Sequence, residues 1–522
     1  MDFRVSTITP DPDPSPFRPA YFSVIRTALV LSLILLAGCR VGPDYKSPPV
    51  EVARSWIDSG NSRLRGDATE NVAWWTTFDD PVLTHLIADV QSQNLTLQIA
   101  GTRILEARAL LGQSQSGLAP QDQIAFGGIK HHHISKNSPT QAIASFLQKN
   151  DFDQWTQGIG VAWELDFWGK YRRTIIAAHA DVDAARASWN ETSLLLAAET
   201  AQTYLQLRTL EHRLVLARQN VKIQTDTLQI TESREEAGTD TDLDVLRATS
   251  NVKETESLIP ALKGLHRVCS NRLCILLGIP PRDLSASIGQ LERIPVPNEQ
   301  LAVGLPADLL RRRPDVCRAE RELAAQSERI GIAAADFYPQ LSISGNVGLD
   351  ALDLTKLYSL RSVAAFAGPS FRWNILNYGR IQNNVRYQEA RYQELLLAYR
   401  NTVLRADEEA ENAIIRYLSN CERIELLRAS VKATQSSVKL AQDAYRLGAI
   451  DYHPLFILES QLVVKQDSLA IAQGELAGQF VDVYKVMGGG WSPAKLVHLP
   501  QVTAEEIPIP PPVVFPGSKY SP

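Results

Sequence analysis

Two stretches of this chain, from Lys170 to Ala237 and from Arg380 to Leu447, contain neither glycine nor proline over 68 residues each. Glycine and proline interrupt α-helices more strongly than any other residue, so each stretch is expected to form one unbroken helix. At a rise of 1.5 Å per residue such a helix is about 100 Å long, several times the length of an average helix. No compact globular domain can contain it, so the fold must include two long rods.

The two rods belong to a pattern that is written twice. The segment from Trp163 to Lys170 recurs as Trp373 to Arg380, 210 positions later, and the same shift relates Gly238 to Gly448. Each glycine follows a rod directly, so each rod is expected to end in a tight turn.

Within the first rod, apolar residues recur at seven-residue spacing. The set comprises Leu207, Leu210, Leu214, Ala217, Val221 and Leu228. Such a heptad pattern predicts a coiled-coil seam along which the rod packs against another helix. The seam alone leaves a solitary dimeric coiled coil open as an alternative.

A different pattern, the alternation of apolar and polar residues, precedes each rod. The alternating apolar positions are Trp155, Ile159, Val161, Trp163, Leu165 and Phe167 in the first half, and Leu341, Ile343, Val347 and Leu349 followed by Val363, Ala365, Phe371, Trp373 and Ile375 in the second. Together with a weaker strand near Gln123 to Lys130, the pattern predicts four β-strands. Each half therefore reads as helix, strand, strand, long helix, turn and helix.

Strands with one apolar and one polar face, and with aromatic residues at their ends, are typical of a transmembrane barrel. A soluble sheet that packs on a core alternates in the same way, and the strands alone do not separate the two. Four strands cannot close a membrane barrel, whose minimum is about eight, and an open edge in hydrocarbon leaves backbone groups unpaired. We therefore expect two, three or four copies to combine into a barrel of about eight, twelve or sixteen strands.

The N-terminus carries an export signal. An apolar run from Thr27 to Ala37 follows Arg18 and Arg26 and is too short to span a membrane. The run ends in Leu36-Ala37-Gly38-Cys39, which resembles the lipobox of bacterial lipoproteins. This resemblance implies cleavage before Cys39 and its acylation, and acyl chains hold a protein on a bilayer without a spanning helix. A chance cysteine after a signal peptide is the alternative.

Composition and motifs argue against several other classes of protein. A net charge of −5 provides no basic field for nucleic acid. The chain has no P-loop, no Gly-x-Ser-x-Gly elbow and no His-Glu-x-x-His motif, so we expect no enzyme and no cofactor. His131, His132 and His133 suggest metal binding, but no Cys, Asp or Glu adjoins them in the sequence. We therefore place them in a solvated loop that runs to Asp151 and expect no metal site.

Four groups of residues occur in a specific order along the mature chain. They are Cys39 followed by Val41-Gly42-Pro43-Asp44-Tyr45, Trp74-Trp75 with Phe78 and Asp80-Pro81, Gly304 to Leu310 with Arg313-Pro314-Asp315, and Tyr484 with Gly488-Gly489-Gly490-Trp491. In this order they resemble the TolC-like outer membrane efflux proteins, and within them the lipidated OprM/NodT branch. The resemblance covers nearly the whole mature chain.

The resemblance implies a mainly α fold with membrane β structure, in which a homotrimer forms a twelve-stranded outer-membrane barrel that continues into an α-helical barrel. It implies a periplasmic adaptor and an inner-membrane pump, usually of the resistance-nodulation-division (RND) type, as partners. The chain would then be the passive exit duct of a tripartite pump for small molecules such as drugs. It would be anchored in outer membrane lipid through Cys39 and extend into the periplasm.

These features divide the chain into six segments. We predict a signal peptide at 1–38, a lipidated N-terminal segment at 39–80, a first outer-membrane-efflux repeat at 81–280, a linker at 281–300, a second repeat at 301–490 and a C-terminal tail at 491–522. Proline clusters at 280–281, 295–297 and 508–512 indicate the linker and the tail.

The turns that follow the two rods are the candidate functional sites, because the family places its periplasmic tip there. The predicted adaptor-docking surface comprises Gly238, Thr239, Leu243, Gly448, Ala449 and Ile450, and the candidate gate residues are Asp240, Asp242, Asp244 and Asp451. Symmetry would convert an inward-facing aspartate into a ring of carboxylates, which favours cations. A solvated acidic turn is the alternative. An EF-hand is not supported, since its sixth position is Val245 and its twelfth is Asn251.

Two other functions remain compatible with the sequence. A TolC-like duct for type I protein secretion has the same fold. A structural, periplasm-spanning lipoprotein would share the rods without conducting. Reconstitution in a planar bilayer separates this last function from a duct.

Overall fold

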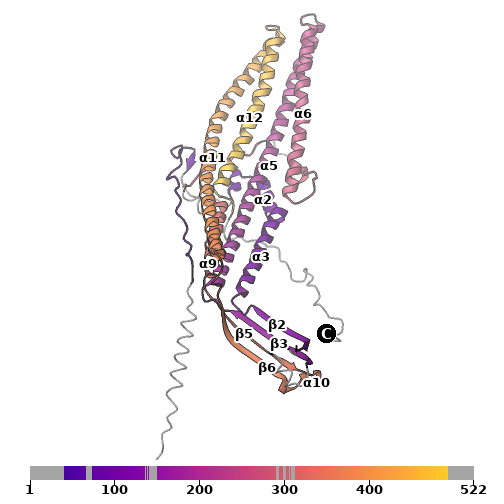
Figure 1. Ribbon diagram of the computed structural model, residues 1–522. Helices are drawn as coiled ribbons and strands as arrows, with labels where there is room; N and C mark the ends of the chain where they lie inside the picture. Colours follow the sequence, from indigo (N-terminus) through magenta and orange to yellow (C-terminus); the bar gives the residue numbers. More distant parts are fainter. Residues whose placement is uncertain are drawn as a thin grey trace, which may run out of the picture. The chain divides into compact units, whose positions relative to one another are not determined.

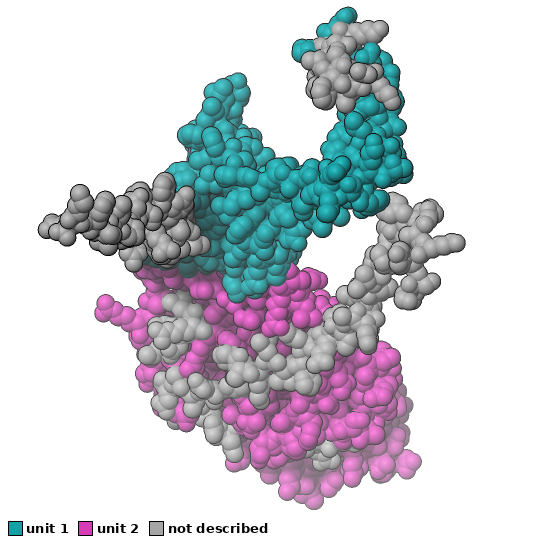
Figure 2. Space-filling model, turned by 90° about the horizontal axis from the view of Figure 1, so that it is seen from below, with its two compact units in different colours: residues 1–46, 110–179, 324–393 teal, residues 47–109, 180–323, 394–522 magenta. Residues whose placement is uncertain are grey.

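A computed structural model describes residues 40–65, 73–135, 137, 139, 150–289, 293–297, 301–304, 306 and 312–491 of the chain. The predicted signal peptide, Cys39, part of the histidine loop, most of the stretch from Leu305 to Leu310 and the tail after Trp491 lie outside the described residues. The chain divides into two compact units, drawn in separate colours in Figure 2. Unit 1 comprises 1–46, 110–179 and 324–393, and unit 2 comprises 47–109, 180–323 and 394–522.

The elements repeat in the predicted order (Figure 1). The first half contains α3 (Leu95–Ser116), β2 (Asp122–His133), β3 (Asp151–Glu164), α5 (Lys170–Glu236) and α6 (Asp242–Leu276), and the second contains α9 (Pro314–Ala335), β5 (Gln340–Ala351), β6 (Val363–Arg372), α11 (Arg380–Arg446) and α12 (Tyr452–Val486). Shorter elements are β1 (Leu64–Arg65), η1 (Trp74–Phe78), α2 (Pro81–Gln93), α7 (Ser285–Ile288), β4 (Leu301–Ala302), α10 (Leu354–Leu357) and η2 (Leu360–Ser362). The prediction of two similar halves is confirmed.

The two rods are the longest elements of each half. The helices α5 and α11 are both 67 residues long, one residue shorter than the glycine-free and proline-free stretches. Each begins directly after a glycine with left-handed backbone, Gly169 at φ +79° and Gly379 at φ +81°. Glycine adopts this conformation without the strain that a side chain adds, so the same residue type starts both rods. In the part of the chain that the structure describes, no helix combines the length and the apolar character needed to cross a bilayer.

Unit 1 contains a four-stranded antiparallel sheet in the order β2-β3-β5-β6. The register places Ile159 of β3 opposite Ala125 of β2 and Val347 of β5, and Val347 opposite Ala365 of β6. The alternating apolar residues of β3, β5 and β6 therefore share one face. In β2, Ala125 and Ile129 lie on this face, whereas Ile124 and Phe126 lie on the other. On the shared face the side chains stay open, since Ile159 is 58% exposed and Val347 54%. A sheet face this apolar and this exposed requires a partner or a lipid environment.

Two strands end earlier than predicted. The strands end at Glu164 in β3 and at Arg372 in β6, so Leu165 and Phe167, and likewise Trp373 and Ile375, lie beyond them. One more backbone hydrogen bond follows β3, from the N–H of Leu165 to the carbonyl of Leu341 at 2.8 Å. The indole of Trp373 turns back instead and donates to the carbonyl of Phe337 at 2.9 Å. Period-two alternation continued past the point where the neighbouring strand could pair, and only the pairing defines the end of a strand.

Unit 2 has an aromatic core that explains two of the motifs. Trp74 is 1% exposed and stacks on Tyr484 with ring centroids 6.2 Å apart. A Cβ on Gly490, which has φ +102°, would lie 2.9 Å from the Trp74 indole nitrogen, so a glycine is needed there. Asp80 caps α2 by accepting from the backbone N–H of Val82 at 2.9 Å, and it also accepts from the Tyr204 hydroxyl at 2.7 Å.

The heptad seam was only partly correct. In unit 2 the interior positions Leu207, Leu210, Leu214 and Ala217 are buried. Closer to the turn Val221 and Leu228 are only half-buried, and the buried positions of α5 are Asn220, Gln224, Thr227 and Thr231. Polar side chains thus replace the apolar seam in the last part of the rod, where hydrogen bonds between helices take over.

Candidate functional site at the helix turns

The turns after α5 and α11 have nearly the same backbone. Gly238 takes φ +74° and Gly448 φ +72°, both in the left-handed region. In each turn the next residue, Thr239 or Ala449, donates its N–H to the carbonyl five residues earlier at 2.9 Å. This Schellman arrangement satisfies carbonyls that the end of a helix leaves free. The glycines therefore have a structural role at both turns.

The six residues predicted to dock an adaptor all lie at these turns. Gly238, Thr239, Leu243, Gly448 and Ala449 are exposed, and Ile450 is half-buried. Leu243 is 54% exposed, and two apolar residues that the sequence analysis did not select, Leu246 and Leu447, are 67% and 85% exposed. Exposed leucines at a helix turn give this end of unit 2 an apolar surface.

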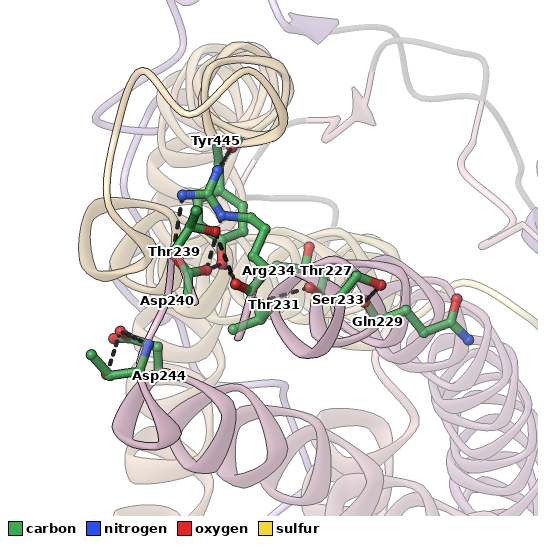
Figure 3. Close-up of polar contacts among 10 residues, drawn as sticks. Thr227, Gln229, Thr231, Ser233, Arg234, Thr239, Asp240, Asp244 and Tyr445 are labelled. Atoms are coloured by element: carbon green, nitrogen blue, oxygen red, sulfur yellow. Dashed lines mark hydrogen bonds and ion pairs between the residues drawn. The ribbon is translucent and has the colours of Figure 1, made fainter. Parts of the chain in front are cut away.

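Asp240 points into the bundle rather than into solvent (Figure 3). Its carboxylate accepts from Arg234 Nε at 3.0 Å, from Arg234 Nη2 at 3.1 Å and from the hydroxyl of Tyr445. Arg234 Nη1 also donates to the Tyr445 carbonyl at 2.8 Å, and the guanidinium lies 4.7 Å from the Tyr445 ring centroid. We call these three residues the Asp240 clamp. It joins the end of α5 to the end of α11.

The clamp is held by charge-assisted hydrogen bonds. The Asp240 side chain is only 6% exposed, so water competes little for its carboxylate. The hydrogen bond to Asp240 raises the pKa of the Arg234 guanidinium. Burial, followed by the hydrogen bond to Asp240, raises the pKa of the Tyr445 hydroxyl. Both groups therefore keep the protons with which they bind Asp240.

The other three aspartates lie in different surroundings. Asp244 belongs to a capping box at the start of α6, in which its carboxylate accepts from the backbone N–H of Thr241 at 3.4 Å. The same carboxylate accepts from the Thr241 hydroxyl at 2.7 Å. Asp242 and Asp451 are exposed, and within the described residues neither has a hydrogen bond or an ion pair through its side chain. The four candidate gate residues are thus brought to one end of the bundle, but only Asp240 links the two rods.

Sequence reasoning missed Arg234 and Tyr445. The shift of 210 that relates the two halves pairs Tyr445 with Glu235 and Asp240 with Ile450. The two rods differ at most of their other positions as well, so the repeat alone does not single out the clamp residues.

A buried polar layer lies between the clamp and the apolar core. Its side chains are Asn220, Gln224, Thr227 and Thr231 of α5, Asn251 and Thr255 of α6, Thr434 of α11 and Glu459 of α12. Glu459 is 2% exposed, and its Oε1 accepts from the Thr227 hydroxyl at 2.6 Å and from Gln442 Nε2 at 3.2 Å. Burial raises the pKa of Glu459 to about 7, although its two hydrogen bonds oppose the rise.

The three histidines correct one prediction. His131, His132 and His133 belong to β2 and not to a loop. His131 Nδ1 lies 2.8 Å from Asp153 Oδ1, and His133 Nδ1 lies 2.5 Å from Asp151 Oδ1 on the neighbouring strand β3. These carboxylates could not be predicted as neighbours of the histidines, because only the sheet register brings them together. Within the described residues, no set of three His, Cys, Asp or Glu side chains is placed to hold a metal ion.

Comparison with known proteins gives the same family over most of the chain. Residues 86–278 and 305–489 match the family described as outer membrane efflux protein. Nodulation protein T of Rhizobium leguminosarum bv. trifolii is 30% identical over 461 residues, which cover 88% of this chain and 96% of that protein. The pyoverdine export outer membrane protein OpmQ of Pseudomonas putida is 27% identical over 463 residues, 89% of this chain and 97% of the relative.

A solved structure extends the likeness to three dimensions. The outer-membrane channel OprN superposes with a TM-score of 0.81 at 31% identity, over 87% of this chain and all of that one. It has the long helices and the four-stranded sheet described above. The chain therefore belongs to the outer membrane efflux protein family, and it is an outer membrane efflux channel, the outer membrane component of an efflux pump, rather than an enzyme.

Proposed function

We propose that three copies of this chain form the exit duct of a tripartite efflux pump for small molecules. The sheet of unit 1 carries this proposal. In the described residues β2 and β6 are edge strands, and the apolar face of the sheet is exposed. Edge strands in hydrocarbon must be paired, and three four-stranded sheets provide about twelve strands, enough for a closed barrel.

The anchor of the duct is Cys39, acylated after cleavage of residues 1–38. The lipobox supports this step. We also propose the segment boundaries given above. The family matches at 86–278 and 305–489 support the two repeats, because they fall within 81–280 and 301–490. The remaining proposed segments are 39–80, 281–300 and 491–522.

The partners of the duct are a periplasmic adaptor and an inner-membrane pump of the RND type. An outer membrane component of an efflux pump has no energy source of its own, so the pump must supply it. The names of relatives support a small cargo. One is called a pyoverdine export protein and another, also from Pseudomonas putida, a toluene efflux pump outer membrane protein. These names favour efflux over type I protein secretion.

A planar bilayer tests the proposal directly. Purified full-length protein is expected to migrate as a trimer in mild detergent and to produce discrete conductance steps. Mass photometry gives the number of copies, and the size of the conductance step gives the width of the pore. A monomeric or dimeric species, or a trimer that never conducts, would contradict the proposal.

The adaptor is proposed to dock on Gly238, Thr239, Leu243, Gly448, Ala449 and Ile450. Replacing Leu243 with aspartate is expected to weaken binding of the adaptor encoded beside this chain about tenfold, because a charge then occupies an apolar contact that excludes water. The affinity is measured with the trimer immobilised on a surface and the adaptor in solution. Val268→Asp is the matched control, since Val268 is 63% exposed on the same helix but far from the turn. Equal affinities for the two variants would place the docking surface elsewhere.

The gate is proposed to lie at the same turns, among Asp240, Asp242, Asp244 and Asp451. The Asp240 clamp supports Asp240 as its main member, because it ties the ends of the two rods together. Asp242 and Asp451 are exposed, and they are the residues that a symmetric assembly can place in a carboxylate ring.

A further inference from the structure

Arg173, in the first turn of α5, is fully buried within unit 1. Its guanidinium uses all five of its N–H donors. Nε donates to the carbonyl of Val41 at 2.7 Å, and Nη2 donates to the carbonyl of Gly42 at 3.0 Å and to Asp44 at 3.3 Å. Nη1 donates to the carbonyl of Pro43 at 3.0 Å and to Glu328 at 2.6 Å. One side chain thus binds three consecutive backbone carbonyls of the N-terminal segment.

The segment is shaped to fit this guanidinium. Gly42 has φ +95°, and a Cβ there would lie 2.5 Å from the Cα of Gly331 in α9. Gly331 in turn leaves room for Arg173, because a Cβ on Gly331 would overlap the arginine side chain. The two glycines leave the space and the arginine provides five hydrogen bonds, so together they form a specific binding site for the N-terminal segment.

The site lies at the junction between strands and helices. The N–H of Val41 donates to the carbonyl of Trp168 at 3.2 Å, just after β3. The ring of Trp168 stacks on Tyr338 with centroids 4.5 Å apart, and its indole N–H donates to the carbonyl of Pro339 at 2.8 Å. Tryptophan and tyrosine gather at the level of lipid headgroups in membrane proteins. Residue 41 is therefore fixed beside the aromatic layer where acyl chains would enter the bilayer.

We propose that Arg173 is the docking residue for the anchor segment and sets the level at which the acyl chains of Cys39 enter the membrane. This rests on the proposed acylation of Cys39. Without the contacts of Arg173, the segment from Val41 to Asp44 becomes a free tether. With them, the lipid anchor and the strands that follow α3 and α9 share one rigid junction.

The geometry of the donors requires arginine. A lysine at this position retains the charge opposite Glu328, but it has three donors on a single nitrogen and cannot reach three carbonyls in a row. If Arg173 served only to balance the charge of Glu328, Arg173→Lys would behave like the unmodified protein. A role in docking predicts that it does not.

The test follows the acyl group through limited proteolysis of the full-length protein in outer-membrane fragments that are broken open, so that trypsin reaches the periplasmic face. Cells are fed an alkyne fatty acid, and trypsin then cuts after Arg40 or Lys46 wherever the segment has come loose. In Arg173→Lys and in Gly42→Ala the fatty-acid label is expected to be cut from the rest of the protein about tenfold faster. The rate of cleavage follows the fraction of molecules in which the segment from Val41 to Asp44 is undocked. Gly42→Ala displaces the segment without changing the Arg173–Glu328 pair, so it reports on docking even if Arg173→Lys folds poorly.

Matched controls separate docking from general damage. Arg218→Lys removes an exposed guanidinium on the same helix. Gly60→Ala adds a methyl group in open space. Neither should change label release. Release at the wild-type rate in both Arg173→Lys and Gly42→Ala would overturn the docking proposal. Wild-type protein without any label would refute the acyl anchor instead, and mass spectrometry of cleavage after Lys46 would still test docking.

Discussion

Replacing Asp240 with alanine is expected to raise the fraction of time that the reconstituted channel spends open by about a hundredfold. The variant leaves Arg234 without its carboxylate and removes one of two acceptors of the Tyr445 hydroxyl, which keeps Thr231 Oγ1 at 2.9 Å. Removing one partner of a buried ion pair typically costs about 3 to 5 kcal/mol. If the clamp exists only while the turns are drawn together, most of this cost falls on the closed form, and each 1.4 kcal/mol shifts the closed-to-open ratio about tenfold.

Single-channel recording in planar bilayers measures this effect. Asp443→Ala is the control, since Asp443 is exposed near the end of α11 and is not one of the proposed gate residues. Tyr445→Phe removes only one of the hydrogen bonds to Asp240 and should produce a smaller increase in the same direction. Indistinguishable open times for Asp240→Ala and Asp443→Ala would exclude the clamp as the gate.

The unmodified bundle is expected to lose local stability between about pH 5 and pH 8, and replacing Glu459 with glutamine is expected to abolish this loss. The pKa of Glu459 is about 7 in the fold because the carboxyl is buried. In the unfolded chain it is close to 4.5. Between these values the folded state holds a proton that the unfolded state has lost. Stability therefore falls as the pH rises through this window and stays low above it.

The size of the effect follows from the two pKa values. A difference of roughly 2.5 pKa units corresponds to about 3 kcal/mol. Glutamine keeps an oxygen that can accept from the Thr227 hydroxyl and carries no charge at any pH. Tyr452 interacts electrostatically with Glu459, and its pKa is raised first by burial and then by the charge of Glu459. Its hydroxyl does not titrate within this window.

Hydrogen exchange of peptides from α12 that contain residues 455–465 measures local stability, after correction for the intrinsic pH dependence of exchange. Exchange in the unmodified protein should accelerate about a hundredfold between pH 5 and pH 8, and Glu459→Gln should flatten the profile. Glu475→Gln is the control, because Glu475 lies on the same helix with 46% of its side chain exposed. A steep profile in Glu459→Gln would assign the pH dependence to another group.

Much of the fold followed from local rules that the sequence states directly. The absence of glycine and proline predicted the two rods to within one residue, because helix interruption depends on the residue itself. Period-two alternation predicted all four strands, and the repeat predicted their order. The limits of the strands at Trp373 and Ile375 were wrong, since a strand ends where its neighbour stops pairing, and pairing involves residues far apart in the sequence.

The candidate site was harder to predict from the sequence for the same reason. Asp240 was selected by its place after a glycine, but its partners Arg234 and Tyr445 come from two rods separated by 211 positions. The buried layer at Gln224 and Thr227 was hidden because a heptad of apolar residues ran beside it. The carboxylates opposite His131 and His133 became neighbours only through the sheet register.

The two turns share a backbone but carry different side chains: where one has Asp240, the other has Ile450. The contact between the rods is therefore unequal, because one end contributes Arg234 and Asp240 and the other contributes Tyr445. Two similar halves thus meet in an asymmetric pair, and a substitution in one turn is not equivalent to the same substitution in the other.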